Sequence, residues 1–157
     1  NRMTPVEPLT KRSIQLLKTL YDKGQSTNTY TLRVKQDELS KQLGISRQAL
    51  NVHLRKLKST GYIRTGRGFI DVTEKGLNAL GVSTTPAFIF IKVSPIKRIE
   101  VYEKIRELSI ARAFRIAGDE DALIMVEREN MDETLKKLYT VDGIQDTRSY
   151  VTIEFIK

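Results

Sequence analysis

Two short segments with leucines at helical spacing meet at a single glycine, and this pattern constrains the fold more than any other feature of the sequence. Leu39 and Leu43 lie four residues apart, on one face of a predicted short helix. Gly44 suits the left-handed backbone that ends such a helix sharply. Ser46 is a favoured N-cap for a second helix, which we expect to run to about Thr60. Two helices joined by so tight a turn form a helix-turn-helix.

The second of these helices has two faces of opposite character. Its apolar stripe is formed by Leu50, Leu54 and Leu57. Its other face begins with Arg, Gln and Asn, the side chains that hydrogen-bond guanine and adenine in the major groove. The N-terminal end of a recognition helix is the end that usually meets the bases. We therefore predict that DNA is contacted by Ser46, Arg47, Gln48, Asn51, Val52 and Arg55, with Lys41 and Lys58 as phosphate anchors or solvated charges.

A β-hairpin is predicted directly after the helix pair. Two β-rich runs, 62–65 and 69–72, flank Gly66-Arg67-Gly68, whose glycines suit the positive φ of a tight turn. Arg64 and Arg67 would lie on or near its tip, where arginine suits phosphates or a narrow minor groove. The same half of the chain is completed by a predicted helix, a strand and a closing helix, over 10–23, 30–34 and 73–80.

Together these residues match a known pattern. The chain reads Glu38-Leu39-x3-Leu43-Gly44-Ile45-Ser46-Arg47-Gln48-Ala49-Leu50-Asn51-x-His53-Leu54-x2-Leu57-x3-Gly61-Tyr62-Ile63. This pattern closely resembles the DNA-binding helix-turn-helix of bacterial and archaeal regulators. Its part from Ser46 to Leu54 is especially similar to biotin-repressor and MarR-like winged-helix domains, and the hairpin follows where their wing lies. The resemblance implies a winged helix-turn-helix domain that binds DNA.

The second half alternates β-rich runs with segments of helical periodicity. The first run, Ala87 to Val93, is continuously apolar, which favours burial on both faces. Asn130 and Glu133 have the spacing of a capping box at a helix start. Further strands are expected over 112–116, 122–127 and 149–156, and helices over 95–108 and 130–138. The order βαββαβ is that of a ferredoxin-like domain, so the fold class is α+β.

This half also resembles a known family. Its motifs are Ala87-Phe88-Ile89-x-Ile91-Lys92-Val93, Arg115-Ile116-Ala117-Gly118-Asp119-x-Asp121-Ala122-Leu123-Ile124-x-Val126 and Val141-Asp142-Gly143-Ile144-x-Asp146-Thr147. They are similar to the C-terminal effector domain of the Lrp/AsnC (feast/famine) regulators. The resemblance implies a domain that dimerises through its sheet, builds larger rings and binds an amino acid near the Gly-x-x-Asp loop. It makes Gly118, Asp119 and Asp121 candidates for an effector loop, with a plain hairpin turn as the alternative. The extra strand and the Gly-rich wing of the first half depart from the plainer helix-turn-helix of that family.

Positive charge is concentrated in the first half of the 157-residue chain. The formal net charge is +8, but residues 1–83 carry 15 Lys and Arg against six acids, a balance of +9. Residues 84–157 carry 12 against 13, a balance of −1. Such asymmetry indicates a polyanionic partner for the first half, with nucleic acid ahead of a membrane surface. Composition divides the chain into a loose tail, a winged helix-turn-helix, a linker and an assembly and effector domain, over 1–8, 9–80, 81–86 and 87–157.

Several classes of function are disfavoured by composition. The chain has no Cys and one His, so thiol chemistry, a thiolate metal site and a multi-His centre are excluded. We expect no cofactor and no metal, and the acids of 119–121 read as a solvated turn rather than an acid/base pair. The longest apolar run is far too short to span a bilayer. No secretion signal is recognisable, so we expect a cytoplasmic, nucleoid-associated protein that is not an enzyme.

The sequence therefore predicts a dimeric or larger transcriptional regulator that reads a palindromic operator on double-stranded DNA. Its assembly would use residues 87–157, and a small molecule such as an amino acid would modulate it. One alternative is a nonspecific chromatin-type DNA binder. Another is an RNA-binding protein that uses the ferredoxin-like sheet, although the strand over 122–127 has no aromatic residue for base stacking.

Overall fold

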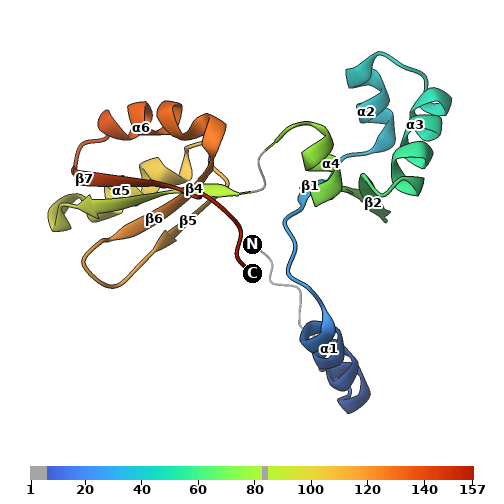
Figure 1. Cartoon of the computed structure of the whole chain (residues 1–157), viewed down its shortest axis with the longest axis horizontal. Coiled ribbons are helices and arrows are strands. Elements are labelled where there is room, and N and C mark those ends of the chain that lie inside the picture. Colours follow the sequence, from blue (N-terminus) through green and yellow to red (C-terminus); the bar gives the residue numbers. More distant parts are fainter. Residues whose placement is uncertain (1–6, 83–84) are drawn as a thin grey trace.

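The computed structural model describes residues 7–82 and 85–157, and it places two separate β-sheets along the chain. Figure 1 shows the first sheet with α2, α3 and α4, and the second sheet with α5 and α6. Residues 1–6 of the expected tail and residues 83–84 of the expected linker lie outside the described residues. The α+β fold class is confirmed.

The helix-turn-helix forms where the leucine and glycine pattern predicts it. Helix α2 spans Gln36–Leu43 and helix α3 spans Arg47–Ser59. Gly44 takes a left-handed conformation, with φ of 66°, and its amide N–H donates to the carbonyls of Lys41 and Ser40. The Ser46 hydroxyl accepts from the amide of Ala49 and so caps α3. The turn and the cap together fix the angle at which α3 leaves α2.

A three-stranded antiparallel sheet follows the helix pair in space. Its order is β1-β3-β2, with β1 over Tyr30–Leu32, β2 over Ile63–Gly66 and β3 over Phe69–Val72. Strands β2 and β3 form the predicted hairpin, and Gly68 in its turn has φ of 80°. Helix α4 spans Glu74–Ala79 and is capped by Thr73, whose side chain accepts from the Gly76 amide. This arrangement is the expected winged helix-turn-helix.

The second sheet has four antiparallel strands in the order β5-β6-β4-β7. Its strands are β4 over Pro86–Val93, β5 over Arg112–Arg115, β6 over Ala122–Glu127 and β7 over Ile144–Val151. Short helical turns over Pro95–Lys97 and Arg128–Asn130 lead into α5 over Arg98–Arg106 and α6 over Met131–Tyr139. In chain order the elements read βαββαβ, so the ferredoxin-like prediction is confirmed.

Only one face of this sheet is covered by helices. Ile89 and Ile91 of β4 and Ile124 of β6 pack with Val101 of α5 and Leu138 of α6 in the core, and all five are fully buried. The prediction that β4 is buried on both faces is wrong, because its burial alternates along the strand. A continuous apolar run therefore marks a strand whose second face is apolar but open.

The last strand, Ile144–Val151, begins and ends five residues earlier than the predicted strand over 149–156. Alternation continues from Ser149 to Ile156, but β7 ends at Val151, which pairs with Ala87 at the beginning of β4. The rest of the chain has no partner strand there, because β4 begins at Pro86. Alternation alone cannot show where the neighbouring strand runs out.

The predicted capping box at Asn130 is also wrong. Asn130 has φ of −101° and ψ of 0°, and its side chain makes no cap hydrogen bond. Its carbonyl instead accepts from the Thr134 hydroxyl at 2.8 Å. The 3-10 turn that precedes α6 fills the helix start, so Asn130 lies inside a continuous helical path rather than at its beginning.

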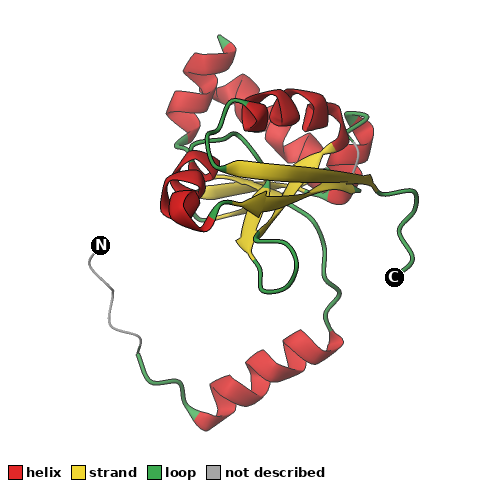
Figure 2. Cartoon of the chain, turned by 90° about the vertical axis from the view of Figure 1, so that its left-hand side faces the viewer, coloured by secondary structure: helices red, strands yellow, loops and turns green. Residues whose placement is uncertain are grey.

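Helix α1, over Lys11–Lys23, forms where predicted and is capped by Thr10. None of its residues is buried, and it stands apart from both sheets and from the other helices in Figures 1 and 2. Apolar spacing predicted the helix correctly but did not reveal that its apolar face lies open.

Candidate nucleic-acid interface

Helix α3 presents the predicted base-reading side chains to solvent. Arg47, Gln48 and Asn51 lie in its first two turns and are exposed. Leu50, on the other side of the helix, is buried at 2 % exposure and anchors α3 to the rest of the domain. Val52 is also exposed, as a thymine-contacting apolar side chain must be. The structure thus leaves the whole polar face of α3 free for a duplex.

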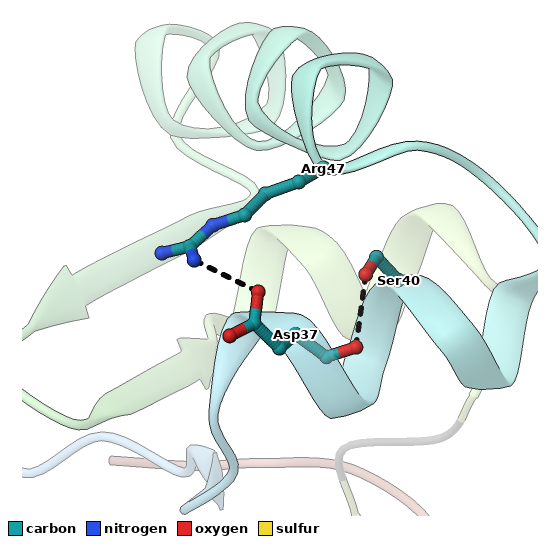
Figure 3. A network of polar contacts seen from close by, with 3 residues as sticks. All are labelled: Asp37, Ser40 and Arg47. Carbon is teal, nitrogen blue, oxygen red and sulfur yellow. Dashed lines mark hydrogen bonds and ion pairs between the residues drawn. The ribbon is translucent and has the colours of Figure 1, made fainter.

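Arg47 is held in place by an acid on the preceding helix. Its guanidinium nitrogen lies 2.8 Å from the Asp37 carboxylate (Figure 3). Ser40 donates to the Asp37 carbonyl at 2.9 Å within the same turn of α2. Both members of the ion pair are more than half exposed, and such surface pairs contribute about 0–1 kcal/mol. Arg47 is therefore oriented by Asp37 but is released at small cost when a stronger anion approaches.

A groove lies beside the first turn of α3, between the wing and the beginning of α2. Its volume is about 640 Å³, and its lining includes three cations, Arg33, Lys35 and Arg47, and two acids, Asp37 and Glu38. The Arg33 guanidinium carbon stands 5.8 Å from the centre of the Phe69 ring, a cation–π distance. The helix-turn-helix pattern of the sequence does not indicate Arg33 and Lys35, which precede it in the chain. Their proximity to Arg47 depends on how β1 enters α2.

The wing carries its arginines at two different places. Arg67 lies in the turn between β2 and β3 and is exposed. Arg64 lies on β2 opposite Asp71 of β3, which in turn accepts from the Thr31 hydroxyl at 2.5 Å. Arg67 thus points from the tip of the wing, whereas Arg64 faces an acid across the hairpin. Of the two, Arg67 has the geometry of a groove or phosphate contact.

The remaining predicted DNA residues are spread around the helix pair. Arg55 and Lys58 are exposed along α3, and Lys41 is exposed near the end of α2. Within the described residues none of these three takes part in an ion pair, and neither does Arg67. Ser46 uses its hydroxyl as the α3 cap, so a phosphate there would meet the backbone amides of the helix start.

The predicted effector loop connects β5 with β6. Gly118 has φ of 140°, and Gly118 and Asp119 are exposed. Asp121 is engaged in the fold, because its carboxylate accepts from the Val93 amide at 2.7 Å and lies 3.6 Å from Arg98. Arg98 Nε is buried without a hydrogen-bond partner among the described residues, and so is Glu120 Oε2. Gly118 and Asp119 are therefore accessible to a ligand, whereas the Asp121 carboxylate holds the loop against β4.

In residues 7–82 and 85–157 no group of three or more His, Cys, Asp or Glu could hold a metal ion. No helix in that part of the chain is long and apolar enough to cross a membrane.

Comparison with known proteins agrees with this geometry. Residues 11–80 match the model of the Crp-like helix-turn-helix domain. Over 154 residues the chain is 24% identical to the HTH-type transcriptional regulator FL11 of Pyrococcus horikoshii, covering 96% of this chain and 91% of that protein. A transcriptional regulator of Neisseria meningitidis, solved as a complex with L-Met, shares the fold with a TM-score of 0.52 at 21% identity, covering 96% of this chain and 93% of that one. AsnC of E. coli matches with a TM-score of 0.47 at 25% identity, covering 89% of each chain.

The winged helix-turn-helix and its exposed basic face form a DNA-binding domain, in agreement with the matched helix-turn-helix model. Over most of its length the chain is similar to transcriptional regulators. The βαββαβ order of the second domain agrees with the resemblance that the sequence motifs indicated.

Proposed function

We propose that the protein binds a specific palindromic operator as a dimer or a multiple of dimers, reading bases with α3. One observation carries this proposal: Arg47, Gln48 and Asn51 are exposed together at the beginning of α3, beside the wing and the groove that Arg47 also lines. Arginine reads guanine and the two amides read adenine, so this set suits discrimination rather than phosphate contact alone. Lys41, Arg55, Lys58, Arg64 and Arg67 would supply sequence-independent affinity.

The open face of the second sheet supports assembly through residues 87–157. Phe88 and Phe90 of β4 pair across the strands with Met125 and Leu123 of β6, and Tyr150 of β7 lies beside Phe88. Such a contiguous apolar face on a sheet is suited to a second copy of itself. A two-fold dimer would then place two α3 helices about one helical turn of DNA apart, roughly 10 bp between half-site centres.

A small molecule such as an amino acid would modulate this assembly at Gly118, Asp119 and Asp121. Gly118 and Asp119 are exposed, and Asp121 fixes the loop against β4. The Neisseria meningitidis relative was solved with L-Met, which supports the class of effector rather than its identity. Acting on DNA, the protein would be associated with the nucleoid in the cytoplasm.

Selection of bound duplexes from a random DNA pool tests the proposal, with oligomer mass measured with and without amino acids. We expect a palindromic motif, a mass that is a multiple of the 18.0 kDa chain, and a change in mass or DNA affinity with an amino acid. Enrichment of no motif would overturn sequence-specific reading and favour a nonspecific chromatin-type binder.

RNA binding is a second candidate, favoured by the aromatic side chains on the open sheet face. Phe88, Phe90 and Tyr150 resemble in placement the stacking residues of RNA-recognition sheets, and Phe90 meets Tyr150 edge to face at 5.6 Å. Their aliphatic neighbours Leu123 and Met125 favour protein contact instead. A competition experiment with single-stranded RNA distinguishes RNA binding from self-association through this face. RNA that binds the sheet would dissociate the dimer, whereas it would not compete with operator DNA for α3.

A further inference from the structure

Helix α1 has a broad apolar face that stays exposed among residues 7–82 and 85–157. Ile14, Leu16, Leu17, Leu20 and Tyr21 fall within one half of the helical circumference, and their exposed fractions run from 51% to 83%. Its opposite half carries the polar side chains Lys11, Arg12, Gln15, Lys18, Thr19, Asp22 and Lys23. An isolated helix of 13 residues is marginal in water, so this face is built to be covered.

The helix-turn-helix shows a matching apolar opening. Its leucines form one interior stripe, yet only Leu50 is buried, at 2% exposure. Leu39 and Leu54 are half-buried, while Leu43 and Leu57 are 58% and 40% exposed. Two helices alone do not close this interior. The missing element is a third helix with an apolar face.

The path of the chain directs α1 away from this opening in its own protomer. At Gly24 the chain leaves α1 in an extended conformation. It is next fixed at Asn28, whose amide donates to the Glu74 carboxylate at 3.0 Å, and at Tyr30, which pairs with Val72. Both views show α1 standing clear of α2 and α3 (Figures 1 and 2).

We propose that α1 packs on the open leucine face of α2 and α3 in a second copy of this chain, in a reciprocal exchange. Each chain supplies both halves of the contact, a donor face on α1 and an acceptor face on the helix pair. Such self-complementarity makes a closed, two-fold interface, and exchange of an identical element is a low-cost route to it. The proposal is independent of the sheet interface suggested above.

Charge agrees with this partner. Helix α1 carries Lys11, Arg12, Lys18 and Lys23 against the single acid Asp22, whereas the first turn of α2 carries Asp37 and Glu38. The exchange would therefore set a basic helix beside an acidic helix start. It would also join the two DNA-reading domains directly, fixing the distance between their α3 helices without the second sheet.

Engineered cysteines test the exchange, because the chain has none of its own. In the full-length double variant Leu17→Cys with Leu43→Cys, oxidation is expected to yield a covalent species of about twice the 18.0 kDa chain mass. Equal mixing of the two single variants is expected to give the same dimer. The control variant combines Gln15→Cys, on the polar face of α1, with Leu43→Cys. It is expected to form at least tenfold less covalent dimer.

Three results would overturn the proposal. An internally cross-linked monomer in the double variant would show that α1 folds back on its own domain. Covalent dimers of Leu17→Cys alone, exceeding those of the mixture, would show that α1 pairs with another α1. No cross-link above the Gln15→Cys control would show that α1 is not seated on Leu43 at all. In each case a native dimer that persists by mass would leave the sheet interface and operator binding intact.

Discussion

Arg47 is the residue on which base reading depends most, and its contact with Asp37 sets its starting position. We expect Arg47→Ala to weaken binding to the selected operator by about 5- to 150-fold, the equivalent of about 1–3 kcal/mol for a bidentate base contact. Fluorescence anisotropy on the operator and on a duplex changed at one base pair measures this loss. Lys136→Ala is the control, because Lys136 is exposed on α6 and far from α3 in the sequence, and this variant should bind the operator as the parent does. If Arg47→Ala weakened the affinity for both duplexes equally, Arg47 would contact only phosphate and not a base.

Asp37 competes with DNA for the Arg47 guanidinium. Asp37→Asn is expected to tighten operator binding by up to about fivefold, because a surface ion pair of about 0–1 kcal/mol no longer has to be given up. Glu38→Gln removes the same charge one residue away and serves as the matched control, since Arg47 bonds Asp37. Titrations at two salt concentrations measure both. If the two variants tighten operator binding equally, the effect comes from the change in net charge and not from loss of the Arg47–Asp37 ion pair.

At this scale the sequence predicted the exposed polar face of α3. Side-chain type and helical position were enough to place Arg47, Gln48 and Asn51 on it, because all three lie on one element, whereas their contact with DNA stays a prediction. Arg33 and Lys35 were not predicted, because they lie near Arg47 only through the path of the chain between β1 and α2. The engagement of Asp121 with the Val93 amide is likewise a contact between distant strands.

At the scale of elements, the left-handed turn between α2 and α3 is the most demanding position. A Cβ on Gly44 would meet nothing within 4 Å, so substitution there acts through backbone strain alone. Gly44→Ala is expected to destabilise the domain by about 1–2 kcal/mol, the cost of a left-handed residue. Thermal unfolding followed by circular dichroism measures it. Gly44→Asn should lose less stability than Gly44→Ala, because Asn tolerates the left-handed conformation better. Equal losses of stability in the two variants would show that the positive φ is not the cause.

Elements were predicted well where the signal is local and poorly where it depends on a neighbour. The predicted cap at Ser46 identified the start of α3 correctly, because its hydrogen bond spans three residues. The end of β7 was wrong because it depends on where β4 begins. The second face of β4 was wrong because apolar side chains there lie on an open sheet surface.

At the scale of the whole molecule, a contact between two side chains links the two sheets. Tyr30 of β1 donates a hydrogen bond to Glu127 at the end of β6. That bond, with partial burial and the negative charges of Glu127 and Glu129, raises the pKa of Tyr30 to about 12 from its ordinary 10. A raised pKa means that the contact is fully present below pH 10 and is lost as pH rises through about 12.

Ultraviolet titration of the phenolate band tests this link. We expect one tyrosine of the parent to ionise near pH 12 and that late component to disappear in Tyr30→Phe. Tyr139→Phe, an exposed residue on α6, should leave it unchanged. Coupling of the two domains should weaken too, so the response of DNA affinity to an effector should fall in Tyr30→Phe. Persistence of the late component would show that Tyr30 and Glu127 do not meet in solution.

The central claim is that α3 reads sequence, and the ratio of affinities for the selected operator and a scrambled duplex at one salt concentration tests it most directly. For the full-length parent we expect a ratio of about 10³ or more, typical of specific recognition. The double variant Gln48→Ala with Asn51→Ala should bring that ratio toward one while the salt dependence changes little, because the phosphate contacts remain. A parent ratio near one, or a ratio unchanged by the double variant, would contradict the account.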